Sequence, residues 1–353
     1  MQLQENVPLA PLTTFQIGGP ARFFVEAASP GDVEEAVHFA QSRNLPLFVL
    51  GGGSNLLIAD AGWPGLVLKV ATRGIERTGD REGKATFEVG AGEAWDDFVG
   101  HAVEADCAGI ECLSGIPGSV GGTPVQNVGA YGQEVSNSID SVEAFDLRDR
   151  QIRELCNEAC GFSYRTSIFN TTERGRFVIL RVTYALVPGG SPYLEYADLK
   201  RYFEGRTQRP SLPETRAAVR EIRARKGMLI VEGDPDCHSA GSFFKNPVLT
   251  EQQHAELTRL ASTKGLKVPS YPALEKNHKV SAAWLVEHSG FTRGYTLGHA
   301  GISTKHALAL VNRGGATANE IVALKAQIQR RVEEKWGVKL EPEPVFVGSV
   351  DSG

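Results

Sequence analysis

Apolar residues recur at helical spacing in two segments that also carry helix-starting signals. Ser29 is a suitable N-cap and Pro30 a suitable first residue, so a helix is predicted to begin there. Thr317 and Glu320 form a capping-box pattern, which predicts a helix that ends at Gly337. The apolar faces of these helices are formed by Val33, Ala36, Val37 and Ala40, and by Ile321, Leu324, Ile328, Val332 and Trp336.

Short apolar runs rich in β-branched residues predict strands between helices. The predicted strands cover residues 46–50, 66–70, 141–147 and 176–187, and a further helix is expected over 94–105. This mixture predicts an α+β fold with two mixed subdomains followed by a smaller α/β lobe. Proline and glycine cluster at 188–192 and 209–213, which we interpret as domain edges.

Size and charge limit the classes of protein to consider. A chain of 353 residues is too long for one hydrophobic core. Its net charge of −5 gives no support for nucleic-acid binding. The sequence contains no apolar run of the roughly 18 residues that a membrane-spanning helix needs, and no signal-peptide core is seen. The five cysteines lack zinc-ligand spacing, so we expect a cytoplasmic protein without a metal.

Residues 113–132 form the most distinctive stretch, with six glycines, two prolines and no charged side chain. Glycine permits turns and close approach to a ligand, and successive backbone N–H groups in such loops bind anions. A flexible linker is the alternative, but linkers lack apolar anchors. Here Ile116, Val120, Val125, Val128 and Tyr131 are spaced to pin the loop to a core. The pattern therefore predicts a packed loop that holds a diphosphate.

Another glycine loop, residues 51–55, comes earlier in the chain and is called the first glycine loop below. It follows a predicted strand, as phosphate-binding loops do. It is not the dinucleotide fingerprint, since Leu56 stands where that motif needs glycine, and the chain has no Walker A motif. Two separate glycine loops suit a long diphosphate cofactor better than a mononucleotide.

Three further motifs place polar groups beside apolar ones. Residues 239–247 set two phenylalanines beside Ser242 and a Lys-Asn-Pro turn, which suits a small-molecule pocket or a turn into a strand. Arg165 lies in an aromatic-rich segment and could grip a carboxylate, or be an edge-strand residue. Glu341 and Glu343 alternate with prolines and should point to one side, although acids near a terminus are usually only solubilising.

Residues 200–226 carry nine Lys or Arg against three acids. Most of these cations are expected to lie on solvated helix surface. Arg223 and Lys226, which lie just before the 239–247 motif, are the candidates to face an anionic ligand.

Taken in order, the motifs resemble the UDP-N-acetylenolpyruvoylglucosamine reductase family (UDP-N-acetylmuramate dehydrogenases). The resemblance runs from about Leu12 to Gly348, and residues 193–199 resemble the type whose tyrosine loop folds over the substrate. The motifs that carry it are Thr-Thr-Phe-x-Ile-Gly-Gly, Gly-Gly-Gly-Ser-Asn, the 113–132 loop, Tyr-Arg-x-Ser-Ile-Phe, Ala-Gly-Ser-Phe-Phe-Lys-Asn-Pro and Glu-Pro-Glu.

The resemblance implies a flavoprotein oxidoreductase with non-covalent FAD and with NADPH as hydride donor. It would reduce UDP-N-acetylglucosamine enolpyruvate to UDP-N-acetylmuramate for peptidoglycan synthesis, and thus for cell-wall biogenesis, cell shape and cell division. The implied fold has a FAD-binding half of the vanillyl-alcohol-oxidase (PCMH) type and a smaller α/β substrate-binding domain, in a monomer. The implied divisions are 1–70 and 71–212 for the FAD-binding subdomains, 213–336 for the substrate-binding domain, and 337–353 returning to the active site.

The resemblance also assigns roles to residues. Arg165 would be the cation over the substrate carboxylate, Ser242 the proton donor, and Glu343 the third catalytic residue, with Glu341 as its competitor. The FAD-binding residues would be Gly51, Gly52, Gly53, Ser54, Asn55, Ile116, Pro117, Gly118, Ser119, Gly121 and Gly122. The substrate-binding residues would be Tyr164, Tyr196, Lys226, Asn246 and Tyr271. The chain departs from the family in its long connection at 227–238, which bears on Lys226.

Two other functions stay open. A flavin oxidase of the same cofactor fold would act on a sugar lactone or phenol, and many such oxidases attach flavin through a histidine in the first glycine loop. Here that loop has neither His nor Cys. A nucleotide-sugar sensor without catalysis would show no NADPH oxidation, but it would need no proton donor such as Ser242.

Overall fold

The computed structural model describes residues 1–273 and 276–349, which form two compact units. The first unit comprises Met1–Val7, Ala21–Gly53 and Trp63–Arg225. The second comprises Pro8–Pro20, Ser54–Gly62 and the chain from Lys226 on. The second unit is therefore assembled from three separate stretches of the sequence.

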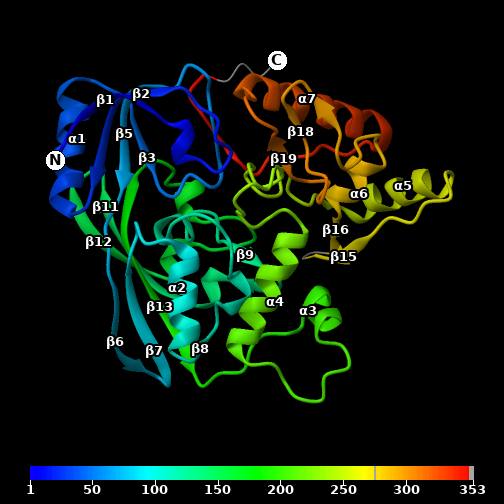
Figure 1. The fold of residues 1–353 in the computed structure, drawn as a ribbon, viewed down its shortest axis with the longest axis horizontal. Helices are drawn as coiled ribbons and strands as arrows, with labels where there is room; N and C mark the ends of the chain where they lie inside the picture. The colour runs from blue at the N-terminus through cyan, green and yellow to red at the C-terminus, as the bar shows by residue number, and fades with distance from the viewer. Residues whose placement is uncertain (274–275, 350–353) are drawn as a thin grey trace. The chain divides into compact units, whose positions relative to one another are not determined.

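The first unit holds two larger sheets, a further two-stranded sheet, and helices (Figure 1). Its helices are α1 (Pro30–Ser42), α2 (Trp95–Glu104), α3 (Ala197–Tyr202) and α4 (Leu212–Arg225). Its strands are β1 (Gln4–Pro8), β2 (Pro20–Ala27), β3 (Leu47–Leu50), β5 (Trp63–Val70), β6 (Ile75–Arg81), β7 (Lys84–Gly90), β8 (Cys107–Ala108), β9 (Gly129–Ala130), β10 (Gln133–Glu134), β11 (Ile139–Asp146), β12 (Gln151–Cys156) and β13 (Phe177–Pro188).

The N-terminal sheet has the order β1-β2-β5-β3, and both β2 and β3 run parallel to β5. Helix α1 connects β2 to the β3 side of this sheet. Its predicted capping holds: the Ser29 side chain accepts from the Asp32 N–H, and the Asp32 carboxylate accepts from the Ser29 N–H. The predicted apolar face of α1 is buried. The chain then leaves β3 directly into the first glycine loop.

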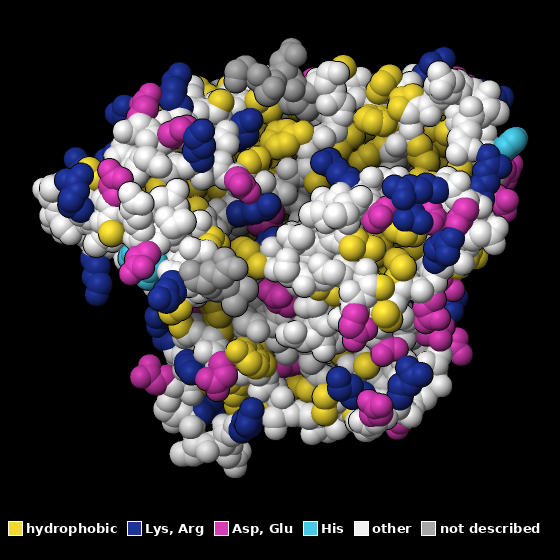
Figure 2. Space-filling model, turned by 180° about the vertical axis from the view of Figure 1, so that it is seen from behind, with side chains coloured by type: hydrophobic (Ala, Val, Ile, Leu, Met, Phe, Trp, Pro, Cys, Tyr) yellow, Lys and Arg dark blue, Asp and Glu magenta, His cyan; other side chains and the backbone are white. Residues whose placement is uncertain are grey.

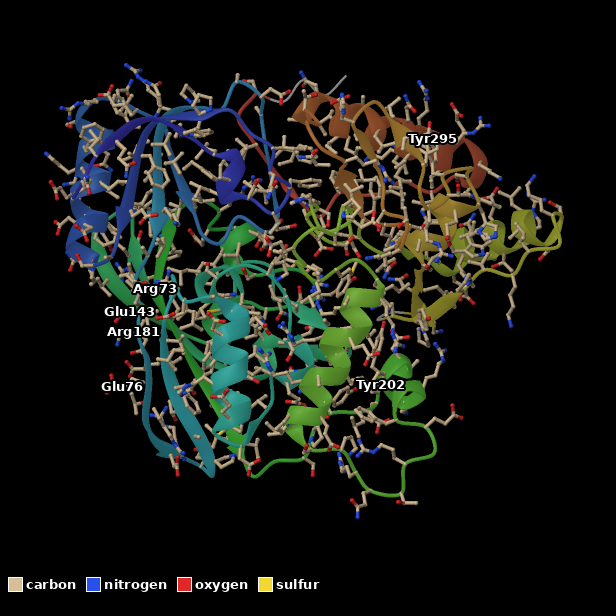
Figure 3. All side chains as sticks on the ribbon, in the orientation of Figure 1. Arg73, Glu76, Glu143, Arg181, Tyr202 and Tyr295 are labelled. Carbon is tan, nitrogen blue, oxygen red and sulfur yellow. The ribbon has the colours of Figure 1, made fainter. Side chains whose placement is uncertain are left out.

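The antiparallel sheet has the order β12-β11-β13-β7-β6. Helix α2 packs on one face of it (Figure 1). The Phe98 ring contacts the rings of both Phe87 of β7 and Tyr184 of β13. The other face carries paired charges: Arg181 lies opposite Glu143 in register and makes a 2.6 Å ion pair with Glu88 (Figure 3). One face of the sheet is thus core and the other polar.

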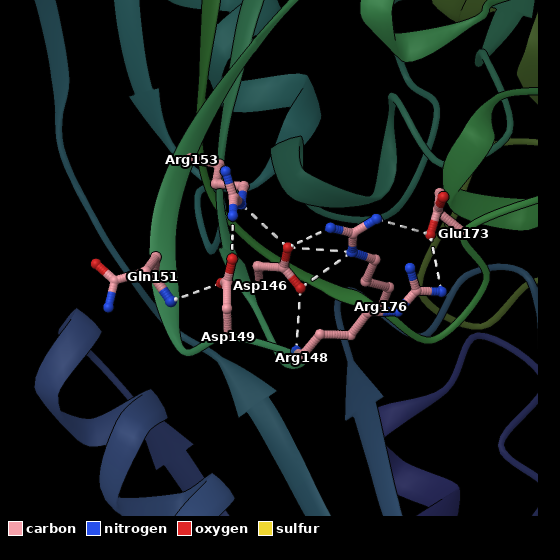
Figure 4. Close-up of polar contacts among 7 residues, drawn as sticks. All are labelled: Asp146, Arg148, Asp149, Gln151, Arg153, Glu173 and Arg176. Carbon is pink, nitrogen blue, oxygen red and sulfur yellow. Dashed lines mark hydrogen bonds and ion pairs between the residues drawn. The ribbon is translucent and has the colours of Figure 1, made fainter.

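A buried carboxylate ties the turn between β11 and β12 to the start of β13 (Figure 4). The Asp146 side chain is fully buried and accepts from Arg176 at 2.6 Å and from Arg153 at 3.1 Å. The Arg148 N–H also donates to it at 3.0 Å. The hydrogen bond from Arg176 is the largest cause that lowers the pKa of Asp146 to about 2.

We expect Asp146→Asn to destabilise the first unit, because it leaves two guanidinium groups facing a neutral amide. The expected cost is about 2 kcal/mol, or roughly 5 °C in Tm. Because the folded-state pKa is depressed, this contribution is present above the ordinary pKa of 3.8 and is lost as the pH falls towards about 2. Thermal unfolding measured over that range should show the two proteins converging. Asp149→Asn is the matched control, since Asp149 is 38% exposed and should cost little; an equal loss in both variants would contradict this account.

The second unit contains small sheets and three helices in its described part. Its helices are α5 (Glu251–Ser262), α6 (Ala282–Glu287) and α7 (Ala318–Trp336). Its strands are β4 (Leu56–Ile58), β14 (Val248–Leu249), β15 (Ser270–Pro272), β16 (His278–Val280), β17 (Thr296–Leu297), β18 (Ala300–Ile302), β19 (Leu310–Asn312) and β20 (Val345–Val347). Within residues 1–273 and 276–349, no helix has the length and apolar character required to cross a membrane.

The capping box predicted for the C-terminal helix starts α7, and Gly337 ends it with φ +68°. The mixture of helices and sheets confirms the predicted α+β class, and the predicted strands and helices match β3, β5, β11, β13, α1, α2 and α7. The predicted domain boundary at residue 213 falls inside α4, which belongs to the first unit. Basic and acidic side chains are interspersed over the face drawn in Figure 2.

Candidate functional site

The 113–132 loop is packed into the first unit rather than forming a linker. Val120 is fully buried in the core, and Ile116, Val125 and Val128 pack against that core while partly buried. Tyr131 is buried in a neighbouring cluster. The predicted apolar anchors are therefore confirmed, and the linker alternative is wrong.

The two glycine loops lie against each other. A Cβ at Gly52 would come within 2.4 Å of the Ser119 backbone nitrogen and 2.5 Å of Gly118. A Cβ at Gly51 would lie 3.0 Å from the Ser119 Oγ. Glycine is thus required at position 52 because the backbones approach more closely than any side chain permits.

The loop also rests on the start of α2. The Trp95 N–H donates to the Gly118 carbonyl at 3.1 Å, and Ala94 and Ser119 form an antiparallel bridge. The N–H groups of Val120 and Gly121 donate to the carbonyls of Glu93 and Ala91. These bonds hold one side of the loop rigid.

The other side of the loop pair fits a diphosphate. Within the described part of the chain, the backbone N–H groups of Gly52, Gly53 and Ser119 have no protein acceptor, and the buried Ser119 Oγ has no hydrogen-bond partner. Buried polar groups normally find partners, so the unpartnered Ser119 hydroxyl, beside backbone donors that have no protein acceptor, indicates a polar ligand. The residues present therefore fit the diphosphate of FAD.

A turn that carries Arg165 docks on the same loop. Ser163 and Thr166 exchange backbone hydrogen bonds, and Arg165 between them has φ +55°. The Arg165 Nη2 donates to the Gly129 carbonyl at 2.9 Å, and the Ser167 Oγ donates to the Val125 carbonyl at 2.6 Å. Arg165 thus lies in a turn fixed by the glycine loop, and the edge-strand alternative is wrong.

Asn127 completes this attachment. Its side-chain nitrogen donates to the Ser163 carbonyl at 3.0 Å and to the Glu134 carboxylate at 2.7 Å. Asn127 and Tyr131 have φ of +45° and +49°, so with Arg165 three non-glycine residues here adopt the left-handed region. Such strain clusters at functional sites. Asn127 lies within the 113–132 loop, but the sequence pattern did not predict a role for it.

Arg223 of α4 reaches the start of the same loop. It is buried, and its Nε donates to the Gly115 carbonyl at 3.1 Å, while the Gly115 N–H donates to Asp96 at 2.6 Å. Burial raises the pKa of Tyr131 to about 12, and the nearby Arg223 cation opposes this rise. Arg223 is therefore buried, whereas Arg206 of the same segment is exposed.

Two predicted substrate residues are exposed in the first unit. Tyr164 is 41% exposed, and the Arg165 guanidinium lies 5.7 Å from its ring centre. Tyr196 is the N-cap residue of α3, and its ring meets that of Tyr131 edge to face at 5.4 Å. Both tyrosines therefore lie beside residues of the glycine loop or the Arg165 turn.

In the second unit, the backbone directly after Ser242 is fixed by two hydrogen bonds of Phe243. The Phe243 N–H donates to the Leu308 carbonyl at 2.7 Å, and the Phe243 carbonyl accepts from the Glu343 N–H at 2.8 Å. Phe243 and Phe244 are buried core residues rather than pocket walls. The half-buried Ser242 and Glu343 are thus placed on adjacent backbone segments.

The C-terminal segment returns to this place because β20 pairs in parallel with β4. The Asn55 side chain donates to the Glu343 carbonyl at 3.2 Å, and the Val345 N–H donates to the Asn55 carbonyl. The Ser54 carbonyl accepts from Thr14. Glu341 differs from Glu343: its side chain is 77% exposed and lies 3.6 Å from the Lys245 ammonium.

The long connection at 227–238 is held to the loop after β18. The buried Asp236 accepts from the Thr304 N–H at 3.0 Å, and Asp234 accepts from the Lys305 ammonium at 2.5 Å. Lys226 lies at the start of this connection. Burial lowers the pKa of His306 to about 4, and the positive charges of Lys226 and Arg293 add to this effect.

The remaining predicted substrate residues also belong to the second unit. The Asn246 side-chain oxygen accepts from the Ala282 N–H at 2.9 Å, at the start of α6. Tyr271, in β15, is 62% exposed. The structure thus brings Ser242 and Glu343 onto neighbouring backbone, and brings Arg165 onto the glycine loop of the first unit.

Comparisons with known proteins agree with this arrangement. The family model of an FAD binding domain matches residues 21–155, and that of the UDP-N-acetylenolpyruvoylglucosamine reductase C-terminal domain matches residues 234–347. The chain is 47% identical to the UDP-N-acetylenolpyruvoylglucosamine reductase of Streptomyces coelicolor, over 99% of this chain and 91% of that protein. It is 43% identical to that of Thermobifida fusca over 97% of each.

Among solved structures, the UDP-N-acetylenolpyruvylglucosamine reductase of Thermus caldophilus superposes with a TM-score of 0.66 at 27% identity. The match covers 99% of this chain and 100% of that one. Sequence and fold therefore agree over the whole length, and the chain belongs to the UDP-N-acetylenolpyruvoylglucosamine reductase family.

Proposed function

We propose that this chain is the NADPH-dependent, FAD-containing reductase that converts UDP-N-acetylglucosamine enolpyruvate into UDP-N-acetylmuramate, a peptidoglycan precursor. The observation that carries the proposal is the contact between the two glycine loops, together with the buried Ser119 hydroxyl that has no hydrogen-bond partner. That arrangement fits a diphosphate cofactor within a full-length family match.

In this proposal, the two glycine loops would hold FAD, which would supply hydride transfer between NADPH and the terminal CH₂ carbon of the enolpyruvyl group. Negative charge then builds on the adjacent carbon and its carboxylate. Arg165 holds that carboxylate, and its fixed turn on the glycine loop supports such a role because a preorganised cation need not reorient as the charge develops.

Ser242 donates the proton that completes the reduction at the adjacent carbon. A serine is a weak acid in water, so this role needs surroundings that stabilise the alkoxide left behind. The hydrogen-bonded backbone of Phe243, directly after Ser242, supports the assignment, since it holds the segment that carries the hydroxyl. Glu343, on the neighbouring backbone segment, assists at the same carbon.

We propose Glu343 rather than Glu341 as the third catalytic residue. Glu343 is half-buried and held by hydrogen bonds at its N–H and its carbonyl, whereas Glu341 is exposed. Glu343→Gln is expected to lower kcat by roughly 10²-fold, the scale of a lost acid–base group. Glu341→Gln, the matched control, should stay near wild type in steady-state turnover; the reverse pattern would transfer the role to Glu341.

The alternative of a flavin oxidase differs in how the flavin is held. Because the first glycine loop has no His or Cys, we propose non-covalent FAD. Flavin should then leave the denatured protein in the supernatant after acid or heat precipitation. Flavin that stayed with the polypeptide would favour the oxidase.

The function is tested by steady-state NADPH oxidation with and without UDP-N-acetylglucosamine enolpyruvate, with mass spectrometry of the product. Oxidation that needs this substrate and yields a product two hydrogens heavier is expected. Absence of oxidation at saturating substrate would favour the sensor.

We further propose a cytoplasmic monomer, to be checked by cell fractionation and light scattering.

A further inference from the structure

A second buried carboxylate lies outside the machinery described so far. Glu111 begins a short 3₁₀ turn before the 113–132 loop and is fully buried. Buried carboxylates are costly unless they are hydrogen-bonded. Its partners therefore show what it holds in place.

Glu111 accepts hydrogen bonds from three separate segments. One oxygen accepts from the Gly109 N–H at 2.8 Å. The other accepts from the Gln133 side-chain nitrogen at 2.9 Å and from the Tyr193 N–H at 2.8 Å. The Gln133 side-chain oxygen in turn accepts from the Cys112 N–H at 2.8 Å. The carboxylate thus links its own turn, the end of the glycine loop, and the segment that leads to Tyr196.

Tyr193 is held at both of its backbone polar groups. Its N–H is bound by Glu111, and its carbonyl accepts from the Cys112 thiol at 3.2 Å. Burial raises the pKa of the Cys112 thiol, which keeps its proton available for this bond. Two consecutive residues, Glu111 and Cys112, therefore hold the backbone of Tyr193 on both sides of its Cα atom.

The rings of this segment then pack on the glycine loop. Tyr193 lies over Gly132, where a Cβ would come within 2.5 Å of its ring and φ is +86°. Tyr196, three residues later, meets Tyr131 edge to face. The Tyr193 backbone contacts and the Tyr196 ring contact thus lie three residues apart on one segment that packs on the loop.

We propose that Glu111 is a positioning residue for substrate binding: by clamping Tyr193 it holds Tyr196 where the UDP-sugar is bound. The inference rests on the proposed substrate contact of Tyr196. A carboxylate is required because the three nitrogen groups that face it, on Gly109, Gln133 and Tyr193, are all hydrogen-bond donors. In Glu111→Gln, an NH₂ group would face at least one N–H donor, which leaves buried donors unsatisfied.

The test uses the FAD-loaded enzyme. Glu111→Gln is expected to raise KM for UDP-N-acetylglucosamine enolpyruvate by roughly tenfold, the scale of one lost charged hydrogen bond. The limiting rate of flavin reduction at saturating NADPH should stay within about twofold, because positioning of the sugar does not enter that step. Asp146→Asn is the control: it also removes a fully buried carboxylate of the first unit, and it should lower Tm without changing KM.

A double-mutant cycle with Tyr196→Ala separates positioning from general structure. If Glu111 acts through Tyr196, adding Glu111→Gln to Tyr196→Ala should raise KM no further. Additive effects, or an unchanged KM in Glu111→Gln, would overturn the inference. An unchanged KM in Tyr196→Ala would remove the Tyr196 contact and this inference with it, whereas turnover by the wild type tests the reductase function independently.

If Glu111→Gln does not retain FAD, Cys112→Ala makes the same test. It removes the thiol that donates to the Tyr193 carbonyl at 3.2 Å and that also lies 3.9 Å from a Glu111 carboxylate oxygen, and it leaves the bond from the Tyr193 N–H to Glu111 in place. KM should rise by about two- to threefold, since a thiol is a weak donor, and this rise should vanish in the Tyr196→Ala background. An unchanged KM in Cys112→Ala would then overturn the inference.

Discussion

Ser242→Ala is expected to separate the two half-reactions of the enzyme. Flavin reduction by NADPH should stay near normal, because it requires no proton from Ser242. Reoxidation by the enolpyruvyl substrate should slow by roughly 10²- to 10⁴-fold, the range attributed to a lost general acid. Anaerobic stopped-flow absorbance of the flavin measures each step in turn.

The structure indicates that Ser242→Ala removes the hydroxyl without moving the backbone. The backbone directly after Ser242 is fixed by hydrogen bonds of Phe243 with Leu308 and Glu343, so loss of the hydroxyl should leave the segment in place. Ser242→Cys is the matched control, since a thiol retains a proton to donate and should recover part of the reoxidation rate. Equal slowing of both half-reactions in Ser242→Ala would count against a proton-donor role.

Gly52→Ala is expected to abolish FAD retention. The new Cβ would lie 2.4 Å from the Ser119 nitrogen and 2.5 Å from Gly118, both backbone atoms that cannot swing aside. The loops would have to separate, at a cost of about 3 kcal/mol or more, which weakens FAD binding by at least about a hundredfold. Flavin absorbance per mole of purified protein measures the loss.

Gly31→Ala provides the control for this prediction. Gly31 lies in α1, and its Cβ would be 3.8 Å from the Ser29 Oγ, an ordinary contact. That variant should purify with the wild-type flavin content. A yellow, fully loaded Gly52→Ala protein would contradict the assignment of the loop pair as the diphosphate site.

Local sequence signals predicted the parts of the fold that depend on local chemistry. The caps of α1 and α7 follow from Ser29 and Thr317, and the burial of Val120 follows from its spacing among glycines. These features depend on contacts within a few residues or on a simple inside–outside pattern. The extent of the units was not predictable in the same way, since residues 8–20 and 54–62 join the second unit through distant pairings such as β4 with β20.

Within the candidate site, sequence reasoning found the glycines but missed their polar supports. Glu111 and Asn127 look like ordinary surface residues in the sequence, yet both are buried and each binds a segment more than thirty residues away. A charge in an otherwise apolar stretch directly before a glycine loop was the available signal for Glu111. The left-handed backbone of Arg165 had no such signal, because it depends on how its turn docks on the loop.

The proposed reductase function is tested most directly by bleaching the purified flavoprotein with NADPH in the absence of oxygen and then adding UDP-N-acetylglucosamine enolpyruvate. We predict that NADPH removes the yellow colour and that this substrate alone restores it, with UDP-N-acetylmuramate as the product. Bleaching that persists after the substrate is added would contradict the reductase, and oxygen would then be the next electron acceptor to test for an oxidase on the same cofactor fold.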